Sequence, residues 1–302
     1  MKRIGFIGVA TAVCMSLAAS LAQTAVASST THRTHLKHSS RPSADDPALR
    51  SSAALVLDLT NSSVLYSRHS DVAAPIASIT KLMTALVVME AGQPLDEMLA
   101  LTEDDRSFGK GAASRLSSGT QLSRGDLMHL ALMASENRAA HALGRNYPGG
   151  VSACVAAMNA KARELGMTTT RFVEPTGLSD ENVASPEDLA KLVVAAAQVP
   201  AIREYSTDGD YLVRIGRREV LFHNTDSLVT KPDWNIVVQK TGYIHEAGRC
   251  LVMQTVIEDR SVVIVLLNSF GKRTRVADAR RVRRWVEATL LSSPGAETAS
   301  RT

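Results

Sequence analysis

The order of hydrophobic patterns along this chain restricts its fold more than any other sequence feature. An alternating apolar pattern over residues 53–66, interrupted by the turn residues Asn61 and Ser62, predicts a β-hairpin near the start of the folded region. Helical patterns follow, and strand patterns return before one last helix. The sequence therefore predicts an α+β fold, in which an antiparallel sheet takes strands from both chain ends and a helical subdomain lies between them.

Helix starts and hydrophobic periodicity give the other elements. Ser185 followed by Pro186 is a strong helix start, because serine caps free N–H groups and proline fits the first turn. The predicted helices cover residues 80–90, 123–134, 151–165, the segment after Ser185, and 275–290. The predicted strands cover residues 211–215, 219–222, 236–238, 250–256 and 262–267. We find no internal repeat and no second domain.

The last predicted helix is amphipathic. Its apolar stripe consists of Val276, Ala279, Val282, Val286 and Leu290, and the arginines at 280, 281, 283 and 284 occupy the opposite face. A helix of this kind can lie on a membrane surface or pack on a sheet. We expect it to pack on the sheet.

The N-terminal segment has the pattern of an export signal. Two basic residues precede an apolar run over residues 4–21, and Ala25-Val26-Ala27 offers the small residues at which signal peptidase cuts. We predict a signal peptide over residues 1–27 and a mature chain that starts at Ser28. The alternative is an uncleaved anchor helix, since the apolar run is close to the length that crosses a bilayer.

Both ends of the mature chain are expected to lie outside the folded domain. Residues 28–49 are rich in serine, threonine, histidine and arginine, so they cannot bury enough apolar surface to offset ordering entropy, and we predict a flexible linker. Its histidines could form a metal tract, but solvated side chains are the expected state in such a segment. They are His32, His35 and His38. We predict a disordered tail over residues 293–302. The folded domain is therefore predicted to cover residues 50–292.

Charge and cysteine content narrow the possible functions. The 34 Lys and Arg residues nearly balance the 30 Asp and Glu residues and are spread along the chain, which argues against a nucleic-acid binder with a basic stripe. Outside the signal segment, the cysteines are Cys154 and Cys250. In an oxidising compartment they could form a disulfide or remain buried free thiols. Neither has His or Asp at ligand spacing beside it, so we expect no metal site.

The first motif that suggests chemistry is Ser78-Ile79-Thr80-Lys81. It opens an apolar helix, which places Ser78 and Lys81 on one face, a single turn apart. Serine becomes a nucleophile when a base takes its proton, and a partly desolvated lysine can have a pKa low enough to be that base. Alone, the motif is weak, because many helices begin with a capping serine and a surface lysine.

Two later motifs bring polar side chains to places where a cleft can form. Ser135-Glu136-Asn137 stands at the end of a helix, where the chain must turn and expose the motif's outer residues. Lys240-Thr241-Gly242 directly follows the predicted strand 236–238. Its glycine allows a substrate backbone to approach the strand edge, and its lysine and threonine can hold a carboxylate.

Taken in this order, the three motifs resemble the S-x-x-K, S-x-N and K-T-G signatures of the penicillin-recognising serine acyltransferases. Residues 172–179 and 240–252 are similar to the low-molecular-mass D-alanyl-D-alanine carboxypeptidase and endopeptidase group. The resemblance covers about residues 50 to 290 and implies a β-lactamase/transpeptidase-like fold. Because the chain stops after one helix, where larger carboxypeptidases continue into a β-rich domain, we expect the endopeptidase branch.

The resemblance implies catalytic roles for the first two motifs. Ser78 would attack the carbonyl of a D-alanine residue and form an acyl-enzyme, with Lys81 as the general base. Ser135 would relay a proton to the leaving amine, and Asn137 would orient Lys81 and the substrate amide. Glu136 replaces the aspartate frequent in the family, and we interpret it as a tolerated middle position.

The same resemblance implies substrate-binding roles for the third motif. Lys240 and Thr241 would bind the leaving-group carboxylate, and Gly242 would allow close approach. The backbone N–H groups of Ser78 and Tyr243 would form the oxyanion hole. Hydrolysis of this kind needs no metal and no organic cofactor.

Several functions are compatible with these motifs. The main hypothesis is a serine D,D-endopeptidase that hydrolyses D-alanyl-diaminopimelate cross-links in peptidoglycan, and the close alternative is a D-alanyl-D-alanine carboxypeptidase. A β-lactamase would need a carboxylate that activates the deacylating water. Glu174 is a candidate, but the asparagine expected four residues later is missing, so we expect a structural role. A non-enzymatic wall-binding protein on the same fold is the third possibility.

The expected partners follow from the endopeptidase hypothesis. They are peptidoglycan stem peptides as substrates and β-lactams as inhibitors, with no nucleic acid and weak or no membrane association. We expect a monomer in the periplasm, exported by a cleaved signal peptide.

Overall fold

The computed structural model of the protein describes residues 46–106 and 114–291. The predicted signal peptide, the three linker histidines and the predicted tail lie outside the described residues. In the described ranges, no helix is both long enough and apolar enough to span a bilayer.

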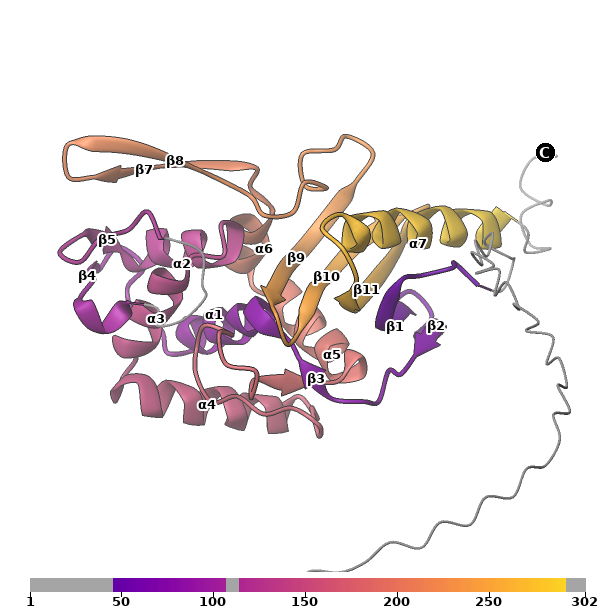
Figure 1. Ribbon diagram of the computed structural model, residues 1–302, viewed down its shortest axis with the longest axis horizontal. Coiled ribbons are helices and arrows are strands. Elements are labelled where there is room, and N and C mark those ends of the chain that lie inside the picture. The colour runs from indigo at the N-terminus through magenta and orange to yellow at the C-terminus, as the bar shows by residue number, and fades with distance from the viewer. Residues whose placement is uncertain (1–45, 107–113, 292–302) are drawn as a thin grey trace, which may run out of the picture. The chain divides into compact units, whose positions relative to one another are not determined.

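A five-stranded antiparallel sheet forms the centre of the described fold, with strand order β2-β1-β11-β10-β9 (Figure 1). Its strands are β1 (Ser51–Asp58), β2 (Ser63–Arg68), β9 (Asn235–Ile244), β10 (Gly248–Ile257) and β11 (Arg260–Ser269). Leu55 of β1 faces Val265 of β11, so a strand from the start of the fold lies beside one from its end. The α+β fold and its sheet drawn from both chain ends are therefore as predicted.

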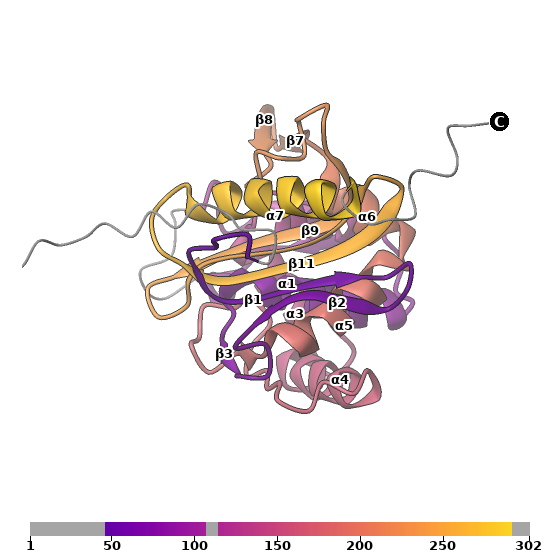
Figure 2. The ribbon, with the colours of Figure 1, turned by 90° about the vertical axis from the view of Figure 1, so that its right-hand side faces the viewer.

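Helices cover both faces of this sheet. On one face, α5 (Pro186–Ala197) contacts β1, β10 and β11, and α1 (Thr80–Glu90) packs against α5. On the other face, α7 (Thr274–Leu291) contacts the same three strands (Figure 2). Both faces of the central strands are consequently buried, and in β1 the neighbours Leu55 and Val56 are both inaccessible to solvent. The predicted hairpin is confirmed, although its first strand does not alternate in burial.

The described part of the apolar stripe of α7, residues 276–286, packs on the sheet. Ala279, Val282 and Val286 are fully buried in a cluster that includes Leu251, Ile264 and other sheet residues. The expected packing is thus confirmed, and the alternative of a membrane-lying apolar face is wrong, because that face is already covered by protein.

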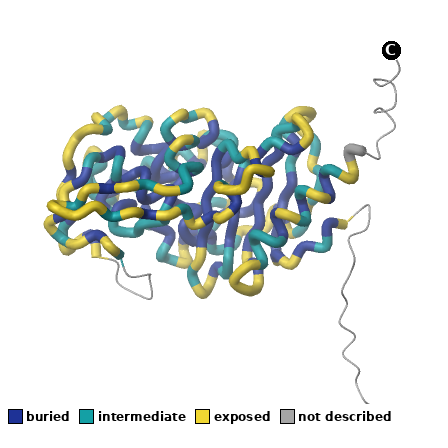
Figure 3. Tube along the Cα trace, turned by 90° about the horizontal axis from the view of Figure 1, so that it is seen from above, coloured by how far each residue is buried: buried dark blue, intermediate teal, exposed yellow. Residues whose placement is uncertain are grey.

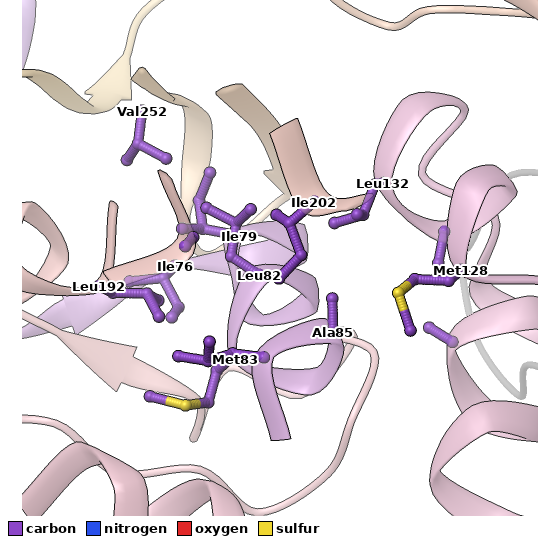
Figure 4. Packing of buried hydrophobic residues seen from close by; sticks show 14 of the residues in the cluster. Ile76, Ile79, Leu82, Met83, Ala85, Met128, Leu132, Leu192, Ile202 and Val252 are labelled. Atoms are coloured by element: carbon purple, nitrogen blue, oxygen red, sulfur yellow. The ribbon is translucent and has the colours of Figure 1, made fainter. Parts of the chain in front are cut away.

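The helical middle of the chain surrounds α1. It contains α2 (Arg124–Met133), α3 (Asn137–Arg145), α4 (Gly150–Glu164) and α6 (Pro200–Thr207). Leu82, Met83, Met128 and Ile202 fill the space between α1 and its neighbours (Figure 4). The short elements are β3 (Ala74–Pro75), β4 (Met98–Ala100), β5 (Gln121–Ser123), β6 (Val183–Ala184) and two 3-10 turns, Ala77–Ile79 and Glu103–Asp105. Buried positions concentrate in the middle of the trace, and exposed ones at its loops (Figure 3).

Two expected strand positions need correction. The predicted strand 236–238 is part of β9, which continues to Ile244, so Lys240-Thr241-Gly242 lies within the strand rather than after it. The strands β7 (Asp210–Ile215) and β8 (Arg218–His223) pair only with each other, as a hairpin separate from the central sheet. Sequence periodicity identifies strands but not the strands with which they pair, so it could not show that β7 and β8 lie outside the central sheet.

Both cysteines within the described residues are free and buried. Cys154 lies on α4 and Cys250 on β10. Burial raises the pKa of the Cys154 thiol to about 12 and that of Cys250 to about 11. The alternative of buried free thiols is confirmed, and the disulfide alternative is wrong.

Candidate active site

Close packing of the backbone around its turn fixes the position of Ser78. It lies in the 3-10 turn Ala77–Ile79, directly before α1, where Ala77 has a left-handed φ of 49°. A Cβ atom added to Gly242 would lie 2.9 Å from the carbonyl oxygen of Ile76, and one added to Gly177 would lie 2.0 Å from that of Ala77. Both glycines therefore make room for the chain's own backbone. The close approach of a substrate backbone at Gly242 stays a prediction.

Lys81 is buried beneath Ser78, one helical turn away. Its side-chain nitrogen lies 2.8 Å from Ser78 Oγ, 2.7 Å from Asn137 Oδ1 and 2.6 Å from the carbonyl oxygen of Thr176. Burial lowers its pKa to about 8, because desolvation disfavours the charged ammonium, and the negative charges of Glu174 and Glu136 only partly offset this effect.

This arrangement is suited to proton abstraction. A neutral lysine amine has two N–H groups and one lone pair. Asn137 Oδ1 and the Thr176 carbonyl can only accept hydrogen bonds, so they take the two N–H groups. The lone pair is then left for the hydroxyl proton of Ser78, at a distance within reach for transfer.

The motif Ser135-Glu136-Asn137 connects α2 to α3. Ser135 adopts a left-handed φ of 59°, and the Glu136 carboxylate caps α3 by accepting a hydrogen bond from the Arg138 N–H. The expected turn is confirmed, and Glu136 has a local capping role in it. Within the described ranges, no hydrogen bond holds the Ser135 hydroxyl, which therefore remains available to a bound molecule.

The motif Lys240-Thr241-Gly242 lies on β9, the edge strand of the sheet beside Ser78. Lys240 is fully buried, and its amine donates to the Thr241 carbonyl at 2.9 Å. The pKa of Lys240 is lowered well below its usual value. Burial is the largest cause, and the positive charges of Lys81 and Arg275 add to it. An anion bound nearby would favour the charged form again.

A cavity of about 450 Å³, which we call the central cavity, brings the three motifs together. Its wall includes Ser78, Ser135, Asn137, Thr241, Gly242 and Tyr243, whereas Lys81 and Lys240 are buried behind this wall. All eight predicted site residues thus meet in one place.

The cavity wall also contains residues that the sequence analysis missed. Arg275 donates to the Gly242 carbonyl at 3.2 Å, and Thr225 Oγ1 lies 2.6 Å from Thr241 Oγ1. Arg249 stacks over the Tyr243 ring at 4.5 Å. No local pattern marks Thr225, and the sequence pattern identifies Arg275 only as the start of the last helix.

The Glu174 side chain holds the backbone near the site through hydrogen bonds. Its carboxylate accepts hydrogen bonds from the N–H groups of Thr176 and Gly177 and from the side chain of Asn182. These bonds agree with the expected structural role. In the described ranges, no three His, Cys, Asp or Glu side chains gather as metal ligands would.

The sequence model of the D-alanyl-D-alanine carboxypeptidase family matches residues 40–271. The chain belongs to this family. A family relative from Pseudomonas aeruginosa, named a D-alanyl-D-alanine endopeptidase, is 49% identical over 256 residues, which cover 84% of this chain and 83% of the relative. One from Escherichia coli with the same name is 46% identical over 253 residues, 83% of this chain and 82% of the relative.

Solved structures support the fold. The crystal structure of a Streptomyces DD-transpeptidase matches with a TM-score of 0.74 at 23% identity, covering 80% of this chain and 98% of that one. The transpeptidase-like fold predicted from the motifs is therefore confirmed, and the family membership rests on the sequence matches.

Proposed function

We propose that this family member is a serine D,D-endopeptidase that hydrolyses D-alanyl-diaminopimelate cross-links of peptidoglycan, and that β-lactams acylate the same serine. The observation that carries the proposal is the buried Lys81 amine, 2.8 Å from Ser78 Oγ and held by two acceptors. The endopeptidase names of the two relatives at 46% and 49% identity support the choice of substrate.

Acylation begins when neutral Lys81 takes the Ser78 proton and Ser78 Oγ attacks the D-alanyl carbonyl carbon. The backbone N–H groups of Ser78 and Tyr243 stabilise the oxyanion that forms. The proton that Lys81 took from Ser78 then moves through the Ser135 hydroxyl to the amine of the leaving group, the C–N bond breaks, and Lys81 is neutral again. The product is an ester between the D-alanyl stem and Ser78.

Deacylation reverses the roles. Water attacks the ester carbonyl, Lys81 takes a proton from that water, and the Ser78 oxygen leaves and regains a proton. Asn137 keeps Lys81 oriented in both half-reactions through its 2.7 Å contact. The chain's own side chains supply every proton transfer in this scheme.

The substrate lies along the edge strand β9. An extended peptide can add to such an edge through main-chain hydrogen bonds. Thr241 Oγ1 and the Arg275 guanidinium lie at the end of the central cavity that receives the leaving-group carboxylate, and the bound carboxylate would favour the charged form of Lys240, which is buried nearby. The substrate's acyl side then lies over Ser78 and Asn137.

D-alanyl-D-alanine carboxypeptidase activity is the second candidate, because the family description names it and the same residues would perform it. We do not propose a β-lactamase, since the Glu174 carboxylate is occupied by backbone and side-chain donors.

The setting of the enzyme belongs to the same proposal. We propose a signal peptide over residues 1–27, a linker over 28–49 and a peptidase domain over 50–292, which acts as a monomer in the periplasm. The peptidoglycan substrate of the family supports action outside the cytoplasm.

Purified residues 28–302, with Ser78→Ala as control, would test the function on cross-linked muropeptide dimers and pentapeptide monomers, with products followed by mass. We expect the wild type alone to resolve dimers into monomers. Loss of one alanine from pentapeptides without dimer cleavage would make the protein a carboxypeptidase. If neither substrate changed, the peptidase proposal would be wrong.

A further inference from the structure

A second cavity, of about 580 Å³, adjoins the central cavity along the start of α7. Six of its lining residues are basic, namely Lys272, Arg273, Arg275, Arg280, Arg281 and Arg284, and no acidic residue lines it. The catalytic scheme uses only Arg275 among them.

Most of the basic residues that line this cavity have no acidic partner among the described residues. Arg281 pairs with Asp278 at 2.5 Å, and Arg275 donates to the Gly242 carbonyl. The other four form no ion pair within the described ranges. They are Lys272, Arg273, Arg280 and Arg284, which we call the basic groove.

Helix geometry explains how the groove is built. Arg280 and Arg284 lie four residues apart on α7, so their side chains leave the helix on one side, and Lys272 and Arg273 directly precede its first residue. The opposite side of α7 is buried on the sheet. Two of the groove's positive charges therefore stand on a helix fixed against the sheet and two directly precede it, and the cavity leaves space for a ligand beside them.

The basic groove continues from a defined end of the central cavity. Thr225 and Arg275 line both cavities. Since Thr225 Oγ1 lies 2.6 Å from Thr241 Oγ1, the junction is at the K-T-G motif, where the leaving-group carboxylate is proposed to bind. A leaving group longer than one residue would extend from this point along α7.

We infer that the basic groove binds the leaving stem peptide of a cross-link through that peptide's free carboxylates. This inference rests on the proposed endopeptidase function. In cross-link cleavage the leaving group is a whole acidic stem peptide, whereas in carboxypeptidase cleavage it is a single alanine, which ends at Thr241. Arg280 and Arg284 are then specificity-determining residues that favour cross-linked substrates.

A membrane surface explains the groove less well. Helices that bind membranes insert an apolar face beside their basic residues. The apolar face of α7 is occupied by the sheet. An acidic peptide needs only the charges and the space, and both are present.

The test compares wild type with the double variant Arg280→Gln/Arg284→Gln on the 28–302 protein. With cross-linked dimers we expect the variant's KM to rise about fivefold or more, with kcat within twofold, because groove contacts are made equally in the ground and transition states. Removal of one alanine from pentapeptide monomers and acylation by a fluorescent penicillin should stay within twofold of wild type.

The matched control is Arg163→Gln/Arg217→Gln, which removes two exposed arginines outside the groove. It should behave as wild type on every substrate. Raising the salt concentration should weaken dimer binding by wild type more than by the groove variant, since screening acts on the charges that the variant lacks. Equal KM values for wild type and groove variant, or an equal loss in the control, would overturn the inference.

Binding of labelled dimer to Ser78→Ala, with and without the groove substitutions, separates this inference from the proposed function. If the wild type is acylated by penicillin but cleaves no dimer, the proposed function fails, and this measurement still decides whether the groove holds the stem. Sedimentation with phosphatidylglycerol vesicles is the last arm. Loss of vesicle binding in the groove variant, with dimer binding unchanged, would make the groove a lipid site and the inference wrong.

Discussion

Lys81 combines two properties that oppose each other in solution. Its side chain is 1% exposed, and this burial makes the amine a base near neutral pH. The same burial requires that every polar group around it be satisfied, and Asn137 and Thr176 meet that requirement. The nucleophile's activation thus depends on contacts from α3 and from the loop before Leu178.

The first prediction concerns pH. Since the neutral amine is the base and its pKa is about 8, the rate of acylation of Ser78 should rise nearly tenfold per pH unit between pH 6 and 7 and level off above about pH 8.5. Stopped-flow measurement with a fluorescent penicillin checks this. A rate that is flat from pH 6 to 9 would show that Lys81 is not the titrating base.

The second prediction concerns Asn137. Asn137→Asp places a negative charge 2.7 Å from the Lys81 amine, and a nearby opposite charge favours the ammonium form. The midpoint of the pH profile should move up by about one unit or more, with a loss of about tenfold at pH 7. Asn137→Ala adds no charge, so it should lower the rate without this upward movement.

Individual side chains differ in how well sequence locates them. The three motifs contain seven of the eight predicted residues, because each motif has short internal spacing and a distinct chemical composition, and the family resemblance adds Tyr243. Thr225 and Arg275 are brought to the site by tertiary packing alone, from a loop and from the start of α7. Nothing within a few residues of either position signals that contact.

The loop that carries Gly177 packs against the turn that carries Ser78 and fixes its position. Gly177 has a left-handed φ of 80° and lies against the Ala77 carbonyl. The loop's conformation is fixed from inside by the Glu174 carboxylate. The position of the nucleophile is therefore set by two segments that lie about 100 residues apart in the sequence.

The third prediction compares two glycines. Gly177→Ala introduces both backbone strain and a 2.0 Å clash, so it should cost about 3 kcal/mol or more and slow acylation at least tenfold. Gly166→Ala has a φ of 69° but no atom within 4 Å of the new Cβ, so it should cost about 1 kcal/mol and leave acylation unchanged. Urea unfolding and penicillin acylation check both. Equal effects of the two substitutions on stability and acylation would refute the proposal that the Gly177 loop fixes the position of Ser78.

Element boundaries and partners were predicted unequally. The helix over residues 80–90 was predicted to the residue, and Ser185 caps its helix as expected. Ser123, the first residue of the predicted helix 123–134, is the N-cap of α2. The strand β9 was predicted too short, because Gln239, Lys240 and Thr241 are polar although all three are buried. A periodicity argument assigns such residues to a loop, whereas the site requires them inside the sheet.

For the molecule as a whole, stability does not depend on a covalent cross-link between Cys154 and Cys250. The fourth prediction is that a thiol-alkylating reagent leaves the native 28–302 protein unmodified and adds two groups after denaturation, because burial suppresses the thiolate at both positions. Intact mass measures this, and the melting temperature should be the same with and without reductant. Resistance to alkylation after denaturation without reductant would indicate a disulfide.

The global architecture was predictable because it depends on order rather than on detail. Strand, helix and strand patterns along the chain leave few ways to close a single sheet. The separate β7 and β8 hairpin was not predicted as separate, since its alternation is that of any half-exposed strand pair. Its two strands pair with each other across the short turn between Ile215 and Arg218.

The pairing of β1 with β11 also determines when the protein can fold. Leu55 finds its partner Val265 only after nearly the whole domain has been made, so the central sheet has a high contact order and is expected to form late. A chain that crosses a membrane N-terminus first, as proposed here, would stay open and translocation-competent until its last strand emerged. The topology that brings the chain ends together would thus delay folding in a way that suits the export proposed above.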